Sequence, residues 1–362
     1  MSASRAPAAS GSAWRGIVRE FRDILPPIPD EAVVTLLEGN TPLVPAPALA
    51  ARISPGLALY LKVEGQNPTG SFKDRGMTVA VSRAKAAGAS ILVCASTGNT
   101  SASAAAYAAR GGLRCAVVIP EGQIALGKLA QAMVHGARVV AVRGNFDVAL
   151  DLVRGLGQEK NVAVVNSINP DRIEGQKTIA YEIAAALGGE TPDVHALPVG
   201  NAGNITATWM GYEERRRSRG GKSPRMLGFQ AEGAAPIVRG ERVADPKTLA
   251  TAIKIGNPAS WKGALEARDQ SGGLIEAVTD DEIVAAYRAL ADLEGVFVEP
   301  ASAAGIAGLL KLGARGDLKG VRTAVATVTG HGLKDPERAV QVSAKVETVD
   351  ADPGLIRKLI LG

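Results

Sequence analysis

The sequence predicts an α/β protein that is built from parallel β-sheets with helices on both faces. Strand-like and helix-like segments alternate from about residue 57 onward, an order typical of parallel strands connected by helices. The 42 glycines and the aromatic content of 4% suit many strand-to-helix turns where the backbone approaches a ligand. A chain of 362 residues is long enough for two lobes, each with its own sheet, and for a ligand cleft between them.

Apolar runs separated by glycines and polar turns predict the first series of elements. Strands are expected at residues 57–63, 91–94, 115–119, 138–142 and 162–165, and helices at residues 74–87, 100–110, 128–135 and 147–156. Gly88 and Gly136 follow two of these helices, which is the usual position of a glycine that ends a helix. We expect residues 76–169 to form a small, mobile domain.

The second series follows residue 170. Helices are expected at residues 173–187 and 205–214, and strands at residues 195–199, 226–230 and 323–328. Thr279 and Glu282 form a helix-start signature for a helix that runs toward residue 293. The proline-containing segment between residues 230 and 274 is expected to hold helices and loops. We expect residues 13–75 and 170–362 to form a large domain, and residues 1–12 to form a flexible arm.

Charge and histidine content exclude two classes of function. Lys and Arg number 41 and Asp and Glu number 36, so a net charge of +5 is a weak field for this length. The arginines at residues 215–219 stand beside two glutamates, which is typical of a solvated helix end rather than of a nucleic-acid patch. The three histidines, His135, His195 and His331, form no metal-ligand pattern, so we expect no metal centre.

The two cysteines indicate a reducing compartment. Cys94 and Cys115 lie in separate apolar strands, where buried, reduced thiols are expected rather than a disulfide framework. The first twelve residues contain no apolar core of a signal peptide, and no apolar run approaches the length of a membrane span. We therefore expect a cytoplasmic protein with no membrane partner.

Residues 67–75 (NPTGSFKDR) follow a predicted strand and open a predicted helix. Pro68 and Gly70 are typical of the turn, and we expect Ser71 to cap the helix, which places Lys73 in its first turn. A cation is disfavoured beside the positive end of a helix dipole. Lys73 is therefore suited to act as a neutral amine or to form a Schiff base, although the spacing alone favours an ordinary surface lysine at a helix start.

Two further strand-to-helix turns carry groups that bind anions. Residues 96–101 (STGNTS) offer hydroxyls, an amide and helix-start N–H groups, which suit a carboxylate. Residues 200–204 (GNAGN) contain two glycines, and their successive N–H groups suit a phosphate. A well-capped helix and a tight turn would produce the same two patterns.

Other kinds of active site fit the sequence less well. Residues 122–128 (GQIALGK) match the first seven positions of a P-loop, but Leu129 stands where a Ser or Thr must bind Mg²⁺. This substitution disfavours a nucleotide triphosphatase. The predicted turns contain neither a G-x-G-x-x-G dinucleotide fingerprint nor a G-x-S-x-G nucleophile elbow.

In combination, these motifs resemble the fold-type II pyridoxal-phosphate enzymes, and within them the threonine synthase family of the short bacterial type. The resemblance covers about residues 35–345. It is supported by residues 38–43 (EGNTPL), 166–178 (NSINPDRIEGQKT), 299–303 (EPASA) and 329–335 (TGHGLKD). The resemblance implies a two-lobed fold like that of the tryptophan synthase β-subunit. It also implies that the P-loop-like stretch is a strand-loop-helix connection of the small lobe that binds no nucleotide.

The resemblance also implies a cofactor, pyridoxal 5′-phosphate, and the residues that hold it. Lys73 would attach to the cofactor aldehyde and would serve as general base and acid. Asn99 would hydrogen-bond the ring hydroxyl, Phe72 would pack beside the ring, and Thr329 would meet the pyridine nitrogen. The cofactor phosphate would lie on Gly200, Asn201, Ala202, Gly203 and Asn204.

The reaction implied is that of a carbon–oxygen lyase, the conversion of O-phospho-L-homoserine and water to L-threonine and phosphate by γ-elimination and β-addition. This is the last step of threonine biosynthesis. Ser96, Thr97, Asn99 and Thr100 are our candidates for the substrate carboxylate, and Asn166, Ser167, Arg172 and Asn201 for its phosphate. Arg172 is the central candidate because its fork of donors matches phosphate oxygens, although a surface arginine at a helix start is the simpler alternative. A homodimer is common in this family and is expected here.

Two alternatives remain at this point. A serine or threonine dehydratase or a cysteine synthase would use the same cofactor, but residues 166–178 favour threonine synthase. A binding protein that kept the fold and lost the chemistry is disfavoured because Lys73, Asn99 and Thr329 are all present.

Overall fold

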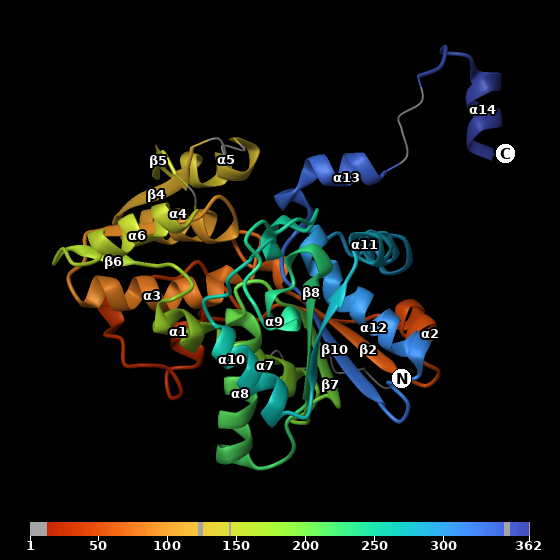
Figure 1. The fold of residues 1–362 in the computed structure, drawn as a ribbon, viewed down its shortest axis with the longest axis horizontal. Helices are drawn as coiled ribbons and strands as arrows, with labels where there is room; N and C mark the ends of the chain where they lie inside the picture. Colours follow the sequence, from red (N-terminus) through yellow and green to blue (C-terminus); the bar gives the residue numbers. More distant parts are fainter. Residues whose placement is uncertain (1–12, 122–125, 145, 344–347, 362) are drawn as a thin grey trace, which may run out of the picture.

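The computed structural model describes residues 13–121, 126–144, 146–343 and 348–361, and these contain two β-sheets flanked by helices (Figure 1). The larger sheet has the order β1-β2-β10-β7-β8-β9 and the smaller one the order β5-β4-β3-β6. The strands are β1 (Leu43–Pro45), β2 (Ala58–Val63), β3 (Ile91–Ala95), β4 (Arg114–Pro120), β5 (Arg138–Val142), β6 (Val162–Val164), β7 (Val194–Pro198), β8 (Arg225–Ala231), β9 (Leu274–Val278) and β10 (Thr323–Val328). Every pair is parallel except β1 with β2, so the predicted α/β class is confirmed.

The helices connect these strands in the order that the sequence predicts. They are α1 (Ile17–Glu20), α2 (Pro47–Ile53), α3 (Lys73–Ala86), α4 (Asn99–Gly111), α5 (Leu126–Val134), α6 (Phe146–Leu156), α7 (Pro170–Ala186), α8 (Gly203–Arg219), α9 (Pro236–Arg239), α10 (Trp261–Gln270), α11 (Asp280–Glu294), α12 (Ala304–Arg315), α13 (Pro336–Val342) and α14 (Pro353–Leu361). The capping box of Thr279 and Glu282 is confirmed at the start of α11. The expected arm at residues 1–12, and residues 122–125 of the P-loop-like stretch, lie outside the described residues.

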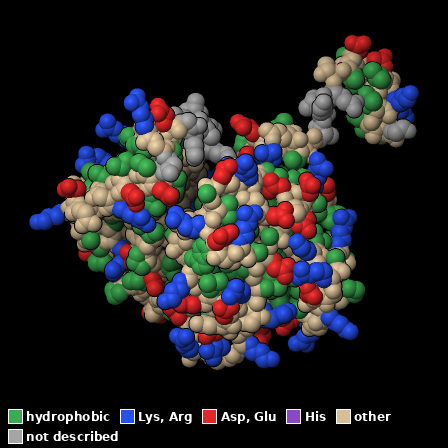
Figure 2. Space-filling model, viewed as in Figure 1, with side chains coloured by type: hydrophobic (Ala, Val, Ile, Leu, Met, Phe, Trp, Pro, Cys, Tyr) green, Lys and Arg blue, Asp and Glu red, His purple; other side chains and the backbone are tan. Residues whose placement is uncertain are grey.

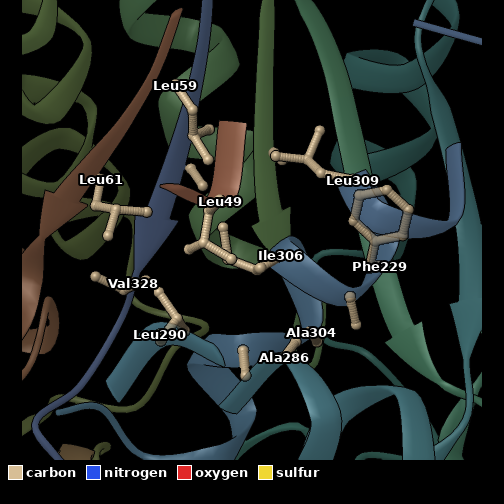
Figure 3. Close-up of a cluster of buried hydrophobic side chains, with 14 of the residues drawn as sticks. Leu49, Leu59, Leu61, Phe229, Ala286, Leu290, Ala304, Ile306, Leu309 and Val328 are labelled. Atoms are coloured by element: carbon tan, nitrogen blue, oxygen red, sulfur yellow. The ribbon is translucent and has the colours of Figure 1, made fainter. Parts of the chain in front are cut away.

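One face of the larger sheet is covered by α2, α11 and α12. Leu49 of α2, Leu290 of α11 and Ile306 of α12 are fully buried, and they belong to one hydrophobic cluster with Leu61 of β2 and Phe229 of β8 (Figure 3). Removal of this apolar surface from water is the main stabilising contribution to this lobe. This packing fixes the positions of the strands, and therefore of the loops that follow them.

The carboxyl ends of neighbouring parallel strands bring the predicted motifs to common edges. In the larger sheet β10 lies between β2 and β7, so Thr329, the loop that leads to Lys73 and residues 200–204 leave the sheet at one edge. In the smaller sheet β3 pairs with β6, so residues 96–101 and Ser167 also emerge together. In open α/β sheets, ligands bind outside the carboxyl ends of strands at such positions.

The two cysteines are buried as predicted and are free thiols on the adjacent strands β3 and β4. Burial raises the pKa of the Cys115 thiol to about 12, and it also raises that of Cys94. A thiol with a raised pKa is a poor nucleophile at neutral pH. Neither cysteine is therefore a candidate for catalysis.

Charged side chains of both signs are interspersed over the face shown in Figure 2. In α8, Arg216 donates two hydrogen bonds to Glu213, at 2.9 and 2.8 Å, and both groups lie near solvent. This agrees with the expected solvated helix end. None of the described helices combines the length and the apolar composition needed to cross a bilayer.

A buried charge network lies under the start of α3. Arg75 donates to Glu64 at 2.6 and 2.8 Å and to Glu182 at 2.8 and 2.7 Å, and Lys62 donates to Glu182 at 2.7 Å. Burial alone would raise the pKa of Glu182, but Arg75 and Lys62 outweigh that effect and lower it to about 2. The network joins α3, β2 and α7, and so fixes the helix that carries Lys73.

Glu182→Ala is expected to lower the free energy of unfolding by about 3–5 kcal/mol, because it leaves the buried Lys62 ammonium without its carboxylate. Urea denaturation of the purified variant measures this loss. Asp151→Ala is the matched control, since its ion pair with Arg154 is exposed and should contribute less than about 1 kcal/mol. Equal effects of the two substitutions would contradict a structural role for the network.

Candidate active site

Lys73 is the first residue of α3, and the structure corrects the expected cap of this helix. The cap position is Phe72 rather than Ser71. Ser71 instead forms an antiparallel β-bridge with Gly330. The Phe72 amide donates to the Thr329 carbonyl at 3.0 Å. The oxygen of the Ser71 side chain accepts only a long bond, 3.4 Å, from the Lys73 amide. The pairing fixes Lys73 beside the end of β10.

The Lys73 amine lies in a partly buried environment and 4.2 Å from the centre of the Phe72 ring. Burial and, to a smaller extent, the charge of Arg172 together lower the pKa of Lys73 to about 7, and Glu299 acts in the opposite direction. The simpler interpretation of a surface lysine is therefore wrong. Near neutral pH, a large fraction of this amine is unprotonated and can attack an aldehyde.

This lowered pKa predicts a pH dependence of cofactor uptake by the cofactor-free protein. The unprotonated fraction of Lys73 increases about tenfold between pH 6 and pH 8 and changes little above that. The rate of cofactor uptake should therefore rise about tenfold over this interval and then level off. An ordinary lysine would give a rise of about a hundredfold over the same interval, without a plateau. The rate is measured from the visible absorbance after mixing with pyridoxal 5′-phosphate, and the second profile would contradict the assignment.

The loop at residues 200–204 shows the features of an anion site at the start of α8. Ala202 occupies the cap position with a left-handed φ of 63°. A Cβ on Gly200 would lie 2.9 Å from the Cα of Ile253, so only glycine fits there. The Asn204 amide nitrogen is buried without a partner, while its oxygen accepts from Thr208 at 3.2 Å. An unpartnered donor beside helix-start N–H groups fits a phosphate.

Arg172 is a second buried donor that lacks an anion. It is fully buried in α7, and its Nη1 donates to the Val165 carbonyl at 3.0 Å. Its Nε and Nη2 have no partner, and none of the carboxylates in the described ranges forms an ion pair with it. Burial lowers the pKa of Arg172 to about 10. The alternative of a surface arginine is therefore wrong, and the two free nitrogens match an oxyanion.

The structure places Arg172 next to the helix of Lys73. A Cβ on Gly76 in α3 would lie 2.6 Å from the Arg172 carbonyl oxygen, so glycine permits this close approach of α3 and α7. Ser167 accepts from the Asn201 amide at 3.1 Å, which connects the ends of β6 and β7. Asn201 also accepts from the Ala259 amide at 3.1 Å. These contacts bring together Arg172, Ser167 and Asn201, the candidates for binding the substrate phosphate, from different segments of the chain.

Asn166 differs from its expected role. Its amide oxygen accepts from the Ala95 amide at 3.0 Å, and its amide nitrogen donates to the Ala95 carbonyl at 2.9 Å. Both ends of the side chain are thus used to hold the ends of β3 and β6 together. Ser96, Thr97 and Thr100 are partly exposed, and the Ser96 hydroxyl accepts from the Gly98 amide at 3.2 Å. Their contacts with substrate stay predictions.

Asn99 and Thr329 each have a partner that sequence reasoning missed. Asn99, the first residue of α4, donates to both oxygens of Glu299 at 3.0 Å. The Thr329 hydroxyl lies 2.9 Å from that of Ser302, which also accepts from the Thr329 amide at 2.9 Å. Glu299 and Ser302 belong to the EPASA stretch, which is the only signal in the sequence that points to them.

Comparison with known proteins identifies the class. Residues 34–330 match the family described as pyridoxal-phosphate dependent enzyme, and the chain belongs to this family. The structure of maize serine racemase superposes with a TM-score of 0.73 and 19% identity, and the match covers 96% of this chain and 97% of that one. This likeness shows the shared fold.

Within this family, the chain is a member of the threonine synthases. It is 55% identical to the threonine synthase of Halalkalibacterium halodurans, over 95% of each chain. It is 56% identical to the threonine synthase of Mycobacterium bovis, over 98% of each chain. The cofactor is pyridoxal phosphate, and the described residues fit it: a lysine amine of lowered pKa and a separate loop with an unpartnered buried donor.

Proposed function

We propose that this chain is a threonine synthase that converts O-phospho-L-homoserine and water to L-threonine and phosphate. The observation that carries the proposal is Arg172, an arginine buried beside the helix of Lys73 with two nitrogens that have no partner. Such a group costs free energy unless an anion occupies the site during the reaction. The substrate phosphate supplies that anion, and the relatives that are threonine synthases support it.

The cofactor, when bound, supplies an electron sink for the carbanions of the reaction. We propose that Lys73 holds its aldehyde carbon and then, as the free amine, moves protons at the α- and β-carbons of the substrate. Residues 200–204 hold its phosphate, and Phe72 packs beside its ring. The Thr329 hydroxyl meets the ring nitrogen as a neutral partner, and its contact with Ser302 fixes its position.

The remaining residues position the substrate. Arg172, Ser167 and Asn201 bind the phosphate that leaves from the γ-carbon, and the charge of Arg172 stabilises the leaving group. The hydroxyls of Ser96, Thr97 and Thr100, together with Asn99 at the start of α4, bind the carboxylate. Asn166 has an indirect role, because its amide holds the end of β3 against the end of β6 and so positions the loops that follow them.

An assay with two products separates the proposed function from its alternatives. Purified protein loaded with cofactor is incubated with O-phospho-L-homoserine, and phosphate and threonine are measured in equal amounts if the proposal is correct. The same preparation is given L-serine or L-threonine, and pyruvate or 2-oxobutyrate is measured. Keto-acid formation without phosphate release would identify a dehydratase instead.

We also propose a small mobile domain at residues 76–169, a large domain at residues 13–75 and 170–362, and a cytoplasmic homodimer. The smaller sheet, β3 to β6, lies within residues 76–169, which supports the division. The buried free thiols support a reducing compartment. Light scattering of the purified protein measures the oligomeric state, and a monomeric mass would overturn the dimer.

A further inference from the structure

Glu299 is a buried carboxylate to which the proposed reaction assigns no role. It is 5% exposed and lies at the start of a short turn, Pro300–Ala303, on the side of the larger sheet. No lysine or arginine of the described ranges forms an ion pair with it, although the charges of Lys73 and Lys334 act on it from nearby. Its short hydrogen bonds come from Asn99, which lies 200 residues away in the sequence.

We infer that Glu299 is a positioning residue that aims the amide of Asn99 at the cofactor ring hydroxyl. The Asn99 amide nitrogen donates to the carboxyl oxygens of Glu299, so the nitrogen of the amide, not its oxygen, faces this residue. The nitrogen lies 3.0 Å from each carboxylate oxygen, a geometry in which one hydrogen is shared between both. The second hydrogen of the amide is left for the ring hydroxyl. The inference rests on the role of Asn99 in the proposed function.

The surroundings of Glu299 hold its carboxylate in this position. A Cβ on Gly330 would lie 2.6 Å from the carboxyl carbon, so the carboxylate packs directly on the backbone that follows Thr329. The Glu299 amide donates to the Gly330 carbonyl at 2.9 Å, and the Thr329 hydroxyl lies 3.5 Å from one carboxylate oxygen. Glu299 therefore connects the end of β10, where Thr329 meets the ring nitrogen, with α4, where Asn99 meets the hydroxyl.

A double-mutant cycle on cofactor binding tests this inference without measuring turnover. Glu299→Ala and Asn99→Ala should each raise the apparent Kd for pyridoxal 5′-phosphate about tenfold, since Asn99→Ala removes the bond to the ring hydroxyl and Glu299→Ala removes the carboxylate that aims it. Both should shift the visible absorption maximum of the loaded protein. If Glu299 acts through Asn99, the double variant should bind as Asn99→Ala does, within about twofold. Fold-changes that multiply would overturn the inference.

The controls separate positioning from a general loss of structure. Glu276→Ala removes a partly exposed carboxylate that pairs with Arg315 and should leave both the Kd and the absorption maximum unchanged. Glu299→Gln keeps an acceptor for Asn99 without the charge, so its Kd should lie between those of wild type and Glu299→Ala; it replaces the latter in the cycle if that variant does not fold. An unchanged Kd in Asn99→Ala would remove the role of Asn99 itself. An unchanged Kd in Glu299→Ala alone would remove only the role of Glu299.

Discussion

Lys73→Ala is expected to abolish covalent attachment of the cofactor and to lower kcat by about 10³-fold or more, because we propose that this one amine both holds the aldehyde and moves the protons. The purified variant should lack the yellow colour of the loaded protein. Borohydride reduction of the wild-type protein, followed by peptide mapping, should place the reduced cofactor on the peptide that contains Lys73.

Lys334 provides a demanding control for this result. It is the other lysine whose charge acts on Glu299, and burial lowers its pKa as well. Lys334→Ala should keep the covalent adduct and the yellow colour. An adduct mapped to Lys334, or a yellow Lys73→Ala protein, would show that the lysine assignment is wrong.

Regular elements with strong local signals could be predicted from the sequence alone. The strand at residues 138–142 and the strand at residues 323–328 have the predicted bounds, because each is a short apolar run between polar turns. Helix α8 runs to Arg219, five residues past its predicted end, and stops where Gly220 takes a φ of 75°. The antiparallel edge strand β1 has three residues and no local pattern, so only its pairing with β2 defines it.

The candidate site was predictable where residues directly follow strands. The ends of β2, β3, β7 and β10 could be located from local patterns, and parallel order then brings the loops that follow them together. What local patterns cannot give is pairing across long separations. Ser71 loses its capping role because it pairs with Gly330, and Asn99 gains its partner from Glu299, in each case across at least 200 residues of chain.

Burial was the other missing quantity. The sequence left open whether Arg172 lies on the surface, since a helix-start arginine usually does. The structure buries it because the glycines of α3 and α7 let the two helices approach closely at this point. The sequence alone does not show which helix will approach each of these glycines.

Arg172→Met is expected to separate stability from activity. The substitution replaces a buried guanidinium, two of whose nitrogens lack partners, with an apolar side chain of similar length, so the Tm of the substrate-free protein should stay the same or rise. The same variant should lose about 10²–10³-fold in kcat/KM for O-phospho-L-homoserine, because the leaving phosphate loses charge-assisted bonds. Differential scanning fluorimetry and a phosphate-release assay measure the two effects.

Arg172→Ala and Arg172→Lys complete this series. Arg172→Ala should keep the visible absorbance of the bound cofactor and lose most turnover, since we propose that residues 200–204, and not Arg172, hold the cofactor phosphate. Arg172→Lys keeps the charge but not the planar fork, so it should recover only part of the activity. Normal turnover in Arg172→Ala would show that Arg172 does not bind the substrate phosphate. A lowered Tm with unchanged turnover in Arg172→Met would make the arginine a structural residue, and its two unpartnered nitrogens would then need another explanation.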